Sequence, residues 1–371
     1  MADLQAFLPY YLVWLGLKNS NRAFKSFLAN IPKNADCTKL SSEEISQYSY
    51  MPLRYLSWPL SKVTMARAEN DFNWFNKNEI KIAFFGSKMY PKRLERQKDS
   101  PAILFIRGSL EEKKTCVAIV GTRSPTRYGM DASRLFASEL SRHGICIISG
   151  LARGIDGAAH RAAIEESCCT VAVLGSGLDI IYPKEHEKLA MNIIESGGAL
   201  LSEYPLGFPP KKENFPKRNR ILAGLSDAVI VVEARTRSGA LITARLALEQ
   251  GKDIYAIPGS IFSPCSEATH QLIKDGASLV MYPKDVLLDL HGFASQFPVF
   301  CIQNNIIHDD SLSEEEKQIL SILDYYPTHI DLLCSKMNMP ENLSLSALTS
   351  LELKGLIFSL PGKLYQKTVK S

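Results

Sequence analysis

The residues best suited to chemistry lie in a basic run around one aromatic side chain, residues 211–220, which read KKENFPKRNR. Five of these ten residues are basic and one is acidic. Pro216 suits the first position of a helix, so several cations fall in the first turn, where the helix dipole disfavours each by about 0.3 kcal/mol or more. These cations are Lys217, Arg218 and Arg220. Basic side chains that follow a phosphate backbone, beside a ring such as Phe215 on which a base can stack, are typical of a single-strand nucleic-acid site.

Four other segments combine glycine with hydroxyl or charged residues, and each follows a run apolar enough to be a buried strand. They read GTRSPTRYG (121–129), SGLARGIDGAAH (149–160), GSGLDIIYP (175–183) and EARTRSGALITA (233–244). Glycine allows close backbone approach, and amides, hydroxyls and arginines can hold phosphate oxygens, although tight packing explains each single glycine equally well. The chain has no GxxxxGK[ST] motif, and GSGLDI lacks the third glycine of the dinucleotide fingerprint. We therefore predict an extended anion-binding site.

Candidate catalytic residues are few. Asp156 and His160 lie four residues apart on a predicted helix and could form an acid–base couple, although a helix cap and a local hydrogen bond explain them better. Glu233 ends an apolar strand where a nucleotide-cleaving enzyme needs a carboxylate, but it lacks a partner of matched pKa. Ser149 has no basic neighbour that the sequence fixes, so it is a poor nucleophile. We predict no catalytic residue, no metal and no cofactor.

The elements that must position these segments alternate between residues 114 and 282. Short apolar runs such as TCVAIV, ICIIS, TVAVLG and AVIVVEA are separated by helical patterns of 10 to 15 residues. Continuous apolar strands separated by helices indicate a Rossmann-like, doubly wound and mostly parallel α/β sheet that helices cover on both faces. Ligands bind beyond the carboxyl ends of such strands, which is where the glycine-containing segments fall.

The sequence predicts four parts. Residues 1–75 are helical and rich in aromatics, and residues 76–290 hold a lead-in followed by the α/β pattern. An irregular linker is expected over residues 291–311. Residues 312–371 predict three amphipathic helices and a hairpin around Pro361 and Gly362, which is typical of a winged-helix domain.

The composition is that of an ordinary globular protein. The 371 residues are 46% hydrophobic and 22% charged, and the net charge of +4 permits nucleic-acid binding without arguing for it. The apolar patch near the N-terminus is too short to cross a bilayer and lacks the features of a signal peptide, so we expect a cytoplasmic protein with no membrane association. The eight cysteines contain no CxxC pair, which favours buried, reduced thiols over disulfides or metal ligands.

Seven motifs resemble, in order, those of the DprA (Smf, DNA-processing protein A) family. They are VGTRSPTRYG, ISGLARGIDGAAHRAA, AVLGSGLDIIYP, LLSEYPLGFPP, NFPKRNRILAGLSDAVIVVEA, SGALITARLALEQGKDIYAIPGS and HQLIKDGA. The resemblance is strong over residues 82–282, and the lead-in YPKRLERQKDSPAILFIRGSL fits as well. The segment HIDLLCSKMNMPENLSLSALTSLELKGLI is similar to the family's winged-helix domain.

The resemblance implies a cytoplasmic protein that binds single-stranded DNA and forms a homodimer. It further implies a role in natural transformation, in which family members protect incoming strands and help to load the RecA recombinase, without enzymatic activity. Asn219 is expected to order a loop, and residues 238–243 to add backbone donors. Carried onto matching positions, the DNA site consists of Gly121, Arg123, Ser124, Ser149, Gly150, Gly154, Phe215, Lys217, Arg218, Asn219, Arg220, Ser238, Gly239 and Thr243.

Some segments depart from the family pattern. Family members often carry LPGIG near the N-terminus, whereas this chain reads LGLKNSNRAF, so we expect a helical, sterile-alpha-motif-like or helix-hairpin-helix-like part without a DNA-binding role. Ala268 stands where the family usually has glycine. The winged helix carries nearly balanced charge, which favours a partner over DNA. The resemblance implies a dimer contact at His270, Leu272 and Ile273. An ordinary amphipathic core helix explains these residues equally well.

Two other functions compete with single-strand binding. Related Rossmann-like proteins cleave nucleoside monophosphates through a PGGxGTxxE motif, whereas the corresponding loop here reads EARTRSGALITA, without the paired glycines and the following glutamate. The second alternative is a regulator that binds duplex DNA through the winged helix.

Overall fold

The structure is a computed structural model that describes residues 8–32, 35–97, 99–110, 114–236, 238–291, 312–323, 328–337, 339–354, 356–360 and 362–367. The chain divides into two compact units, Met1–Gly292 and Phe293–Ser371. Apart from residue 291, the predicted linker over residues 291–311 lies outside the described residues. No helix in the described ranges combines the length and the hydrophobicity that a membrane span requires.

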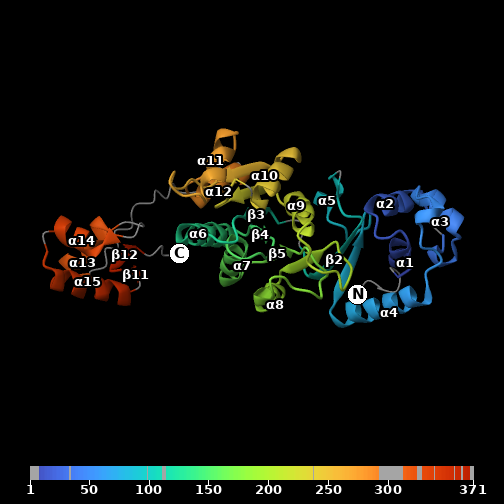
Figure 1. The fold of residues 1–371 in the computed structure, drawn as a ribbon, viewed down its shortest axis with the longest axis horizontal. Helices are drawn as coiled ribbons and strands as arrows, with labels where there is room; N and C mark the ends of the chain where they lie inside the picture. Colours follow the sequence, from blue (N-terminus) through green and yellow to red (C-terminus); the bar gives the residue numbers. More distant parts are fainter. Residues whose placement is uncertain are drawn as a thin grey trace. The chain divides into compact units, whose positions relative to one another are not determined.

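One large sheet forms the centre of the first unit, with the strand order β1-β2-β6-β5-β4-β3-β7-β8-β9 (Figure 1). Its strands are β1 (Ile80–Phe84), β2 (Ile103–Gly108), β3 (Cys116–Val120), β4 (Cys146–Ser149), β5 (Thr170–Val173), β6 (Ala199–Ser202), β7 (Ala228–Val231), β8 (Asp253–Ala256) and β9 (Ser278–Leu279). Strands β3 to β9 pair in parallel, and β1 and β2 add an antiparallel edge. Every residue of β3 to β7 is buried, which explains why these strands read as unbroken apolar runs. The predicted doubly wound, mostly parallel sheet is confirmed.

The strand order reverses at β3, which pairs with β4 on one side and with β7 on the other. In an open α/β sheet, the crevice at such a reversal, beyond the carboxyl ends of the two strands, is the usual ligand site. The segments at residues 121–129 and 233–244 leave the sheet at this point. The topology therefore brings two of the predicted loops together.

Helices cover both faces of the sheet. One face packs on α5 (Lys92–Glu95), α9 (Asn214–Leu225), α10 (Gly239–Glu249) and α11 (Glu267–Lys274). The other face packs on α6 (Arg127–Arg142), α7 (Ile155–Glu165) and α12 (Pro283–His291). The helix α8 (Glu187–Glu195), which follows the short 3-10 helix η4 (Lys184–His186), contacts β5 and β6. The predicted cover of helices on both faces is confirmed.

Helix α9 begins earlier than the sequence suggests. Its first residue is Asn214, whose side-chain amide donates to the carbonyl oxygens of Gly175 (2.8 Å) and Pro209 (3.2 Å). The prediction that Pro216 occupies the first helical position is therefore wrong, because Pro216 is the third residue. A proline is tolerated there because the first four N–H groups of a helix have no partner within the helix.

The N-terminal helices pack on the β1–β2 edge of the sheet. They are α1 (Leu8–Gly16), α2 (Asn21–Asn30), α3 (Ser42–Ser49) and α4 (Lys62–Lys77), with short 3-10 helices at Cys37–Lys39 and Leu53–Tyr55. Tyr11, Trp14 and Phe75 lie with their ring centroids 6.1, 5.9 and 5.4 Å from that of Phe105 in β2. These helices and the sheet thus share one hydrophobic core. A separate domain over residues 1–75 stays a prediction.

The second unit contains three helices and a small sheet. Its elements are α13 (Glu314–Ile322), β10 (Thr328–His329), α14 (Ile330–Met337), α15 (Glu341–Leu353), β11 (Ile357–Leu360) and β12 (Leu364–Lys367). The strands pair in the order β10-β12-β11 around a core that includes Ile319, Leu333, Leu348 and Ile357. A capping box of Ser313 and Glu316 starts α13. The predicted arrangement of three helices and a hairpin is confirmed.

Candidate nucleic-acid interface

A pocket of about 640 Å³ opens beyond the carboxyl ends of β3 and β7. Its walls come from the loops after β3, β4 and β7, from the segment before α8, and from the first turns of α9 and α10. The predicted site residues that line it are Gly121, Arg123, Phe215, Arg218, Asn219, Ser238, Gly239 and Thr243. Those outside its lining are Ser124, Ser149, Gly150, Gly154, Lys217 and Arg220.

Helical periodicity explains which residues of the basic run line the pocket. Phe215, Arg218, Asn219 and Leu222 follow the spacing i, i+3, i+4 and i+7 and form one face of α9. The exposed side chain of Lys217 lies off this face. Of residues 217–220, Arg218 and Asn219 therefore line the pocket, whereas Lys217 and Arg220 do not.

Arg220 points away from the pocket to the N-terminal helices. Its guanidinium forms a short ion pair with the buried carboxylate of Glu203. The same carboxylate accepts a hydrogen bond from the Asn21 side chain (3.3 Å), and Asn21 in turn accepts one from the amide of Ala102 (3.0 Å). Arg220 thus connects α9 to α2 and to the start of β2.

Arg218 lies in the floor of the pocket and is only 3% exposed. Its guanidinium donates to the carbonyl oxygen of Gly150 (2.9 Å) and, at shorter range, to that of Val173, so it joins the ends of β4 and β5. Burial lowers the pKa of Arg218 to about 10, and the neighbouring Asp156 carboxylate opposes this effect. Arg218 therefore stabilises the floor of the pocket by linking two strand ends.

Asp156 and His160 have separate partners. The Asp156 carboxylate accepts hydrogen bonds from the amides of Gly150 (3.1 Å) and Ala152 (3.4 Å). Burial raises its pKa, and the charge of Arg218 opposes that rise. His160 forms a hydrogen bond through Nδ1 with Thr170 Oγ1 (2.8 Å), and burial lowers its pKa to about 3. The predicted helix cap and local hydrogen bond are therefore wrong, because Gly154 is the N-cap of α7 without a side-chain bond and the partner of His160 is Thr170 of β5.

Close packing accounts for glycine at three of the predicted site positions. A Cβ atom on Gly150 would overlap the guanidinium of Arg218, and one on Gly121 would lie 2.5 Å from Ile155 Cγ1. Gly154 has φ +75° and starts α7 where a side chain would meet the carbonyl oxygen of Thr122. Ser149 is fully buried and donates to the carbonyl oxygen of Ile119 (2.6 Å).

Glu233 holds the loop after β3. Its carboxylate accepts hydrogen bonds from the amide (2.9 Å) and the hydroxyl (2.6 Å) of Thr126, and it is 2% exposed. Gly129 must lack a side chain because a Cβ atom there would overlap the same carboxylate. The loop that carries Arg123 and Ser124 is thereby fixed from behind.

The opposite wall contains an aromatic pair. The ring centroids of Tyr182 and Phe215 are 5.6 Å apart, and the Arg123 guanidinium lies 5.0 Å from the Phe215 centroid. Tyr182 is 46% exposed and Phe215 is half-buried. An exposed ring beside a cation can stack on a nucleobase.

The pocket is positively charged. Among the residues that the structure describes, its lining holds four basic residues, Arg123, Lys212, Arg218 and Arg235, and one carboxylate, that of Asp156. Asp156 offsets the buried Arg218, which leaves three exposed cations facing the opening. Sequence reasoning missed Tyr182, Lys212 and Arg235 as site residues. Lys212 belongs to the basic run, and Arg235 lies four residues after the end of β7 in one of the predicted loops, so membership of these two segments was the available signal.

The start of α10 adds polar groups to the lining of the pocket. Ser238 caps the helix by accepting a hydrogen bond from the amide of Ala240 (3.2 Å). The Asn219 side chain donates to the carbonyl oxygen of Gly239 (3.2 Å), and Thr243 Oγ1 lies 3.4 Å from the same oxygen. Asn219 thus ties α9 to the first turn of α10.

The chain matches two family models. The model of DNA recombination-mediator protein A covers residues 81–291, more than half of the chain, and that of the DprA winged helix domain covers residues 308–363. Protein Smf of Escherichia coli is 39% identical over 312 residues, which are 83% of this chain and 82% of Smf. DNA processing protein DprA of Bacillus subtilis is 43% identical over 58% of this chain and 73% of its own length.

Two solved structures share the fold. DNA processing protein A of Streptococcus pneumoniae matches with a TM-score of 0.63 and 35% identity, over 76% of this chain and 97% of that chain. DNA processing protein A of Helicobacter pylori, whose structure concerns its single-stranded DNA binding mode, matches with a TM-score of 0.52 and 32% identity, over 57% and 95%. The chain therefore belongs to the DprA family of DNA processing proteins, and its second unit is a DprA winged-helix domain.

Proposed function

We propose that this protein binds single-stranded DNA in the pocket at the β3–β7 reversal. The observation that carries the proposal is the combination of three exposed cations, Arg123, Lys212 and Arg235, with the exposed ring of Tyr182 in one pocket. Cations that neutralise phosphates and rings that stack on bases are what sequence-tolerant single-strand binding requires. The single-strand binding of the Helicobacter pylori relative supports the proposal.

The remaining predicted contacts have two roles in this proposal. Arg123, Phe215 and the start of α10 line the pocket and face the strand, and the exposed Ser124 and Lys217 meet the strand outside that lining. The others support the pocket, and they are Gly121, Arg218 and Asn219 within its lining and Ser149, Gly150, Gly154 and Arg220 outside it.

We further propose that the bound strand is protected and passed to the RecA recombinase in the cytoplasm, during transformation or recombination. Membership of a family of DNA recombination mediators supports this role. We also propose that the protein acts by binding and not by catalysis, because Glu233, the carboxylate that the nucleotide-cleaving alternative needs, is engaged with Thr126.

Fluorescence anisotropy with single-stranded and duplex oligonucleotides of equal length tests the proposal. We expect tighter binding to the single strand, with a slope of log affinity against log salt of about −0.7 per neutralised phosphate. Replacing Arg123 and Lys212 together by alanine should weaken binding and flatten that slope by about 1.4. The control variant is Lys188→Ala, an exposed lysine of α8 outside the pocket.

Two results would reject parts of this proposal. Equal affinity and slope for the double variant and the control would reject the pocket. Preference for the duplex would favour the regulator, and free base released from nucleotides by the wild type but not by Glu233→Gln would establish the enzyme.

A further inference from the structure

Three cysteines form a row at the amino ends of the parallel strands, at the opposite end of the strands from the pocket. Cys116 begins β3 and its Cα is paired in register with that of Cys146, which begins β4. Cys169 directly precedes β5 and lies one position before the pair Ile147 and Thr170, so it stands next to Cys146. Neighbouring strands are about 4.8 Å apart, within the Cα separation that disulfides span.

All three side chains lie on the same face of the sheet. Cys116 and Cys146 belong to the hydrophobic core under α9 and α10, and Cys169 packs against it. Cys146 is central because β4 lies between β3 and β5, and the neighbouring Cys116 and Cys169 sulfurs, together with burial, raise the pKa of its thiol. The in-register spacing and the shared face place the Cys146 sulfur between its two neighbours.

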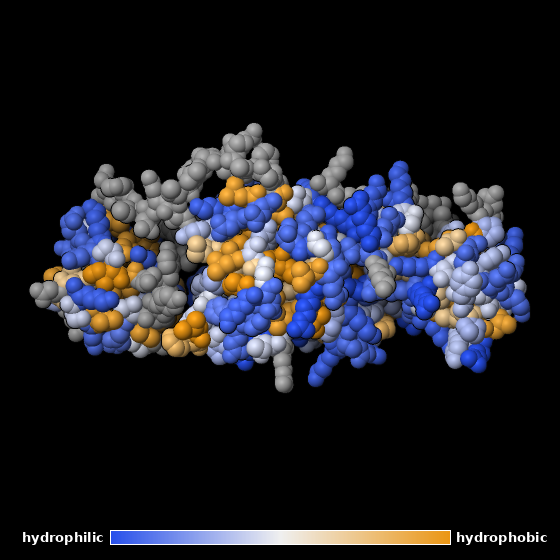
Figure 2. All heavy atoms as spheres, turned by 90° about the horizontal axis from the view of Figure 1, so that it is seen from above, coloured by the Kyte–Doolittle hydropathy of each residue, from blue (hydrophilic) through white to orange (hydrophobic). Residues whose placement is uncertain are grey.

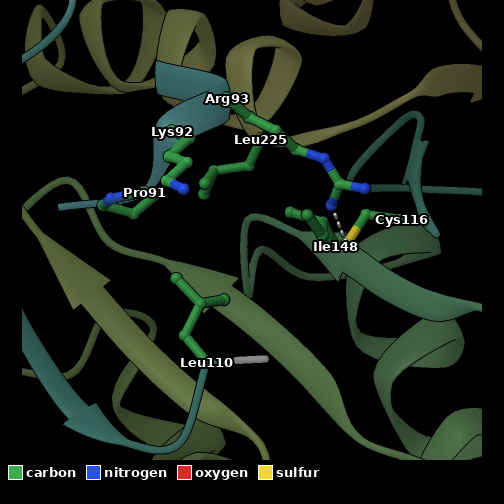
Figure 3. A pocket seen from close by; sticks show the side chains of 7 residues that line it. All are labelled: Pro91, Lys92, Arg93, Leu110, Cys116, Ile148 and Leu225. Atoms are coloured by element: carbon green, nitrogen blue, oxygen red, sulfur yellow. Dashed lines mark hydrogen bonds between the residues drawn. The ribbon is translucent and has the colours of Figure 1, made fainter. Parts of the chain in front are cut away.

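Cations contact both ends of the row. Arg93 Nη1 donates to Cys116 Sγ (3.0 Å), a contact drawn in Figure 3 at the edge of a cavity of about 100 Å³. Lys114 Nζ lies 3.5 Å from Cys169 Sγ. Hydrogen bonds from Cys146 and Cys168, together with the Lys114 charge, lower the pKa of the Cys169 thiol. A sulfur beside a cation has more thiolate character than an ordinary buried thiol.

The three cysteines differ in their exposure to solvent. Cys116 and Cys146 are each 3% exposed, whereas Cys169 is only partly buried. We propose that Cys169 is a peroxide-reactive thiol and that Cys146 is its resolving partner.

The reaction proceeds in two balanced steps. The Cys169 thiolate attacks one peroxide oxygen, the O–O bond breaks, and the released hydroxide takes up a proton to form water. This oxidises Cys169 to a sulfenic acid by two electrons and reduces the peroxide. The Cys146 sulfur then attacks the Cys169 sulfur, the S–O bond breaks, and the leaving hydroxide takes the Cys146 proton to form a second water. A dithiol reductant restores both thiols.

Peptide mapping of the full-length protein after treatment with hydrogen peroxide tests the pairing. We expect one disulfide between Cys146 and Cys169, lost again with dithiothreitol. In Cys146→Ser, Cys169 should accumulate as a sulfenic acid that dimedone traps, and in Cys169→Ser the disulfide should be absent. A disulfide that forms elsewhere first, or one that persists between other cysteines at equal yield in Cys169→Ser, would overturn the proposal.

Alkylation of the wild type provides a measurement that does not depend on any variant folding. With limiting iodoacetamide, Cys169 should be labelled about tenfold faster than Cys334, the half-buried cysteine of the second unit. Lys114→Gln should slow the labelling of Cys169, and Lys114→Arg should restore it. Labelling of Cys169 at or below the rate of Cys334 would contradict the proposal.

Discussion

The arginines of the basic run and the arginine of the loop after β3 differ in the contacts that their charges make. Arg218 is buried and bound to two carbonyl oxygens beside Asp156, Arg220 is paired with Glu203, and Arg123 is exposed in the pocket with its guanidinium near Phe215. A guanidinium whose donors are already used by the protein is poorly placed to hold a phosphate. Exposure therefore distinguishes Arg123 as the one of these three arginines that we propose contacts the ligand.

Substituting Arg218 should affect stability more than DNA contact. Arg218→Met leaves Asp156 as a buried, unpaired carboxylate, so we expect a loss of about 3–5 kcal/mol in the free energy of unfolding, measured in urea. The second substitution Asp156→Asn should recover part of that loss. A variant that unfolds like the wild type but no longer binds single strands would instead make Arg218 a ligand contact.

The exposed ring of Tyr182 offers a test of base stacking. Tyr182→Leu should weaken single-strand binding about 5- to 150-fold, the range expected for one stacked base, and leave the salt slope unchanged because no phosphate contact is lost. Anisotropy at several salt concentrations measures both quantities. Tyr182→Phe serves as the matched control and should bind like the wild type, whereas equal loss in both variants would argue against stacking.

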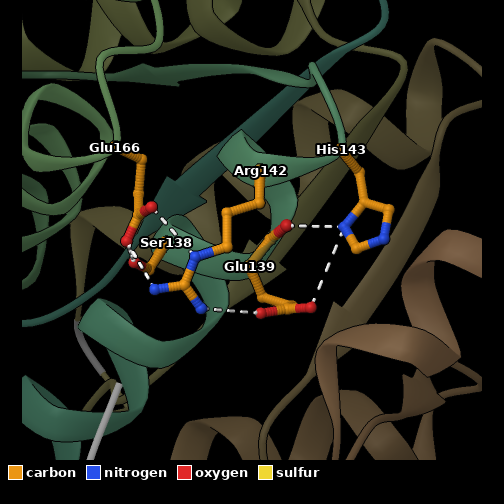
Figure 4. A network of polar contacts seen from close by, with 5 residues as sticks. All are labelled: Ser138, Glu139, Arg142, His143 and Glu166. Carbon is orange, nitrogen blue, oxygen red and sulfur yellow. Dashed lines mark hydrogen bonds and ion pairs between the residues drawn. The ribbon is translucent and has the colours of Figure 1, made fainter. Parts of the chain in front are cut away.

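At the scale of elements, a network of polar side chains joins α6 to α7, which pack on the same face of the sheet. Arg142 near the end of α6 donates to Glu166 after α7 through Nε (2.9 Å) and Nη2 (2.8 Å), and to Glu139 (3.2 Å), while Ser138 makes a short bond to Glu166 (Figure 4). Hydrogen bonds from Arg142 and Ser138 lower the pKa of Glu166. The network is largely exposed, so its contribution to stability is small.

The buried histidine of α7 makes stability depend on pH. His160 is neutral in the fold, with its pKa lowered to about 3, whereas in the unfolded chain it takes up a proton near pH 6.5. Its contribution is complete above pH 6.5 and decreases as the pH falls from there towards 3. Between pH 6.5 and 5 the wild type should lose about 2 kcal/mol more than His160→Gln in urea unfolding. Parallel pH profiles of the two proteins would contradict this assignment.

The sequence predicts strands better than it predicts the roles of helical residues. Unbroken apolar runs such as Val117–Val120 become strands buried on both faces, and the loops beyond them converge because parallel strands share one edge. The basic run is different, because its side chains divide between the pocket and Glu203 according to where α9 starts. That start depends on the long-range hydrogen bonds of Asn214, which local sequence does not reveal.

At the scale of the whole molecule, an exposed hydrophobic area favours self-association through the β8–β9 side of the first unit. Ile261 and Phe262 are 80% and 89% exposed, and Met281, which follows the edge strand β9, is 60% exposed. Figure 2, which views the side on which α10 and α11 lie in Figure 1, shows hydrophobic surface in orange over the part of the unit that holds these helices. The residues predicted from the family resemblance, His270, Leu272 and Ile273, are half-buried on α11 next to it.

We predict that the protein forms a homodimer through this surface and that Phe262→Asp makes it monomeric, because a charge opposes the burial of the surface. Sedimentation velocity at several concentrations measures the change. The matched control is Leu353→Asp, a residue 86% exposed in the second unit, which should leave the dimer intact. An unchanged dimer in Phe262→Asp, or a wild type that is monomeric throughout, would contradict this prediction.

The connection from Arg220 through Glu203 to Asn21 and β2 has an evolutionary consequence. A half-buried guanidinium and a buried carboxylate that form an ion pair cannot be replaced one at a time without leaving an unpaired charge. In related proteins we therefore expect positions 203 and 220 to change together or not at all. Because the proposed function assigns Arg123 and Lys212 to contacts with DNA, we expect them to vary independently of that pair. Within the basic run at residues 211–220, selection for DNA binding would thus act on Lys212, and selection for folding would act on Arg220.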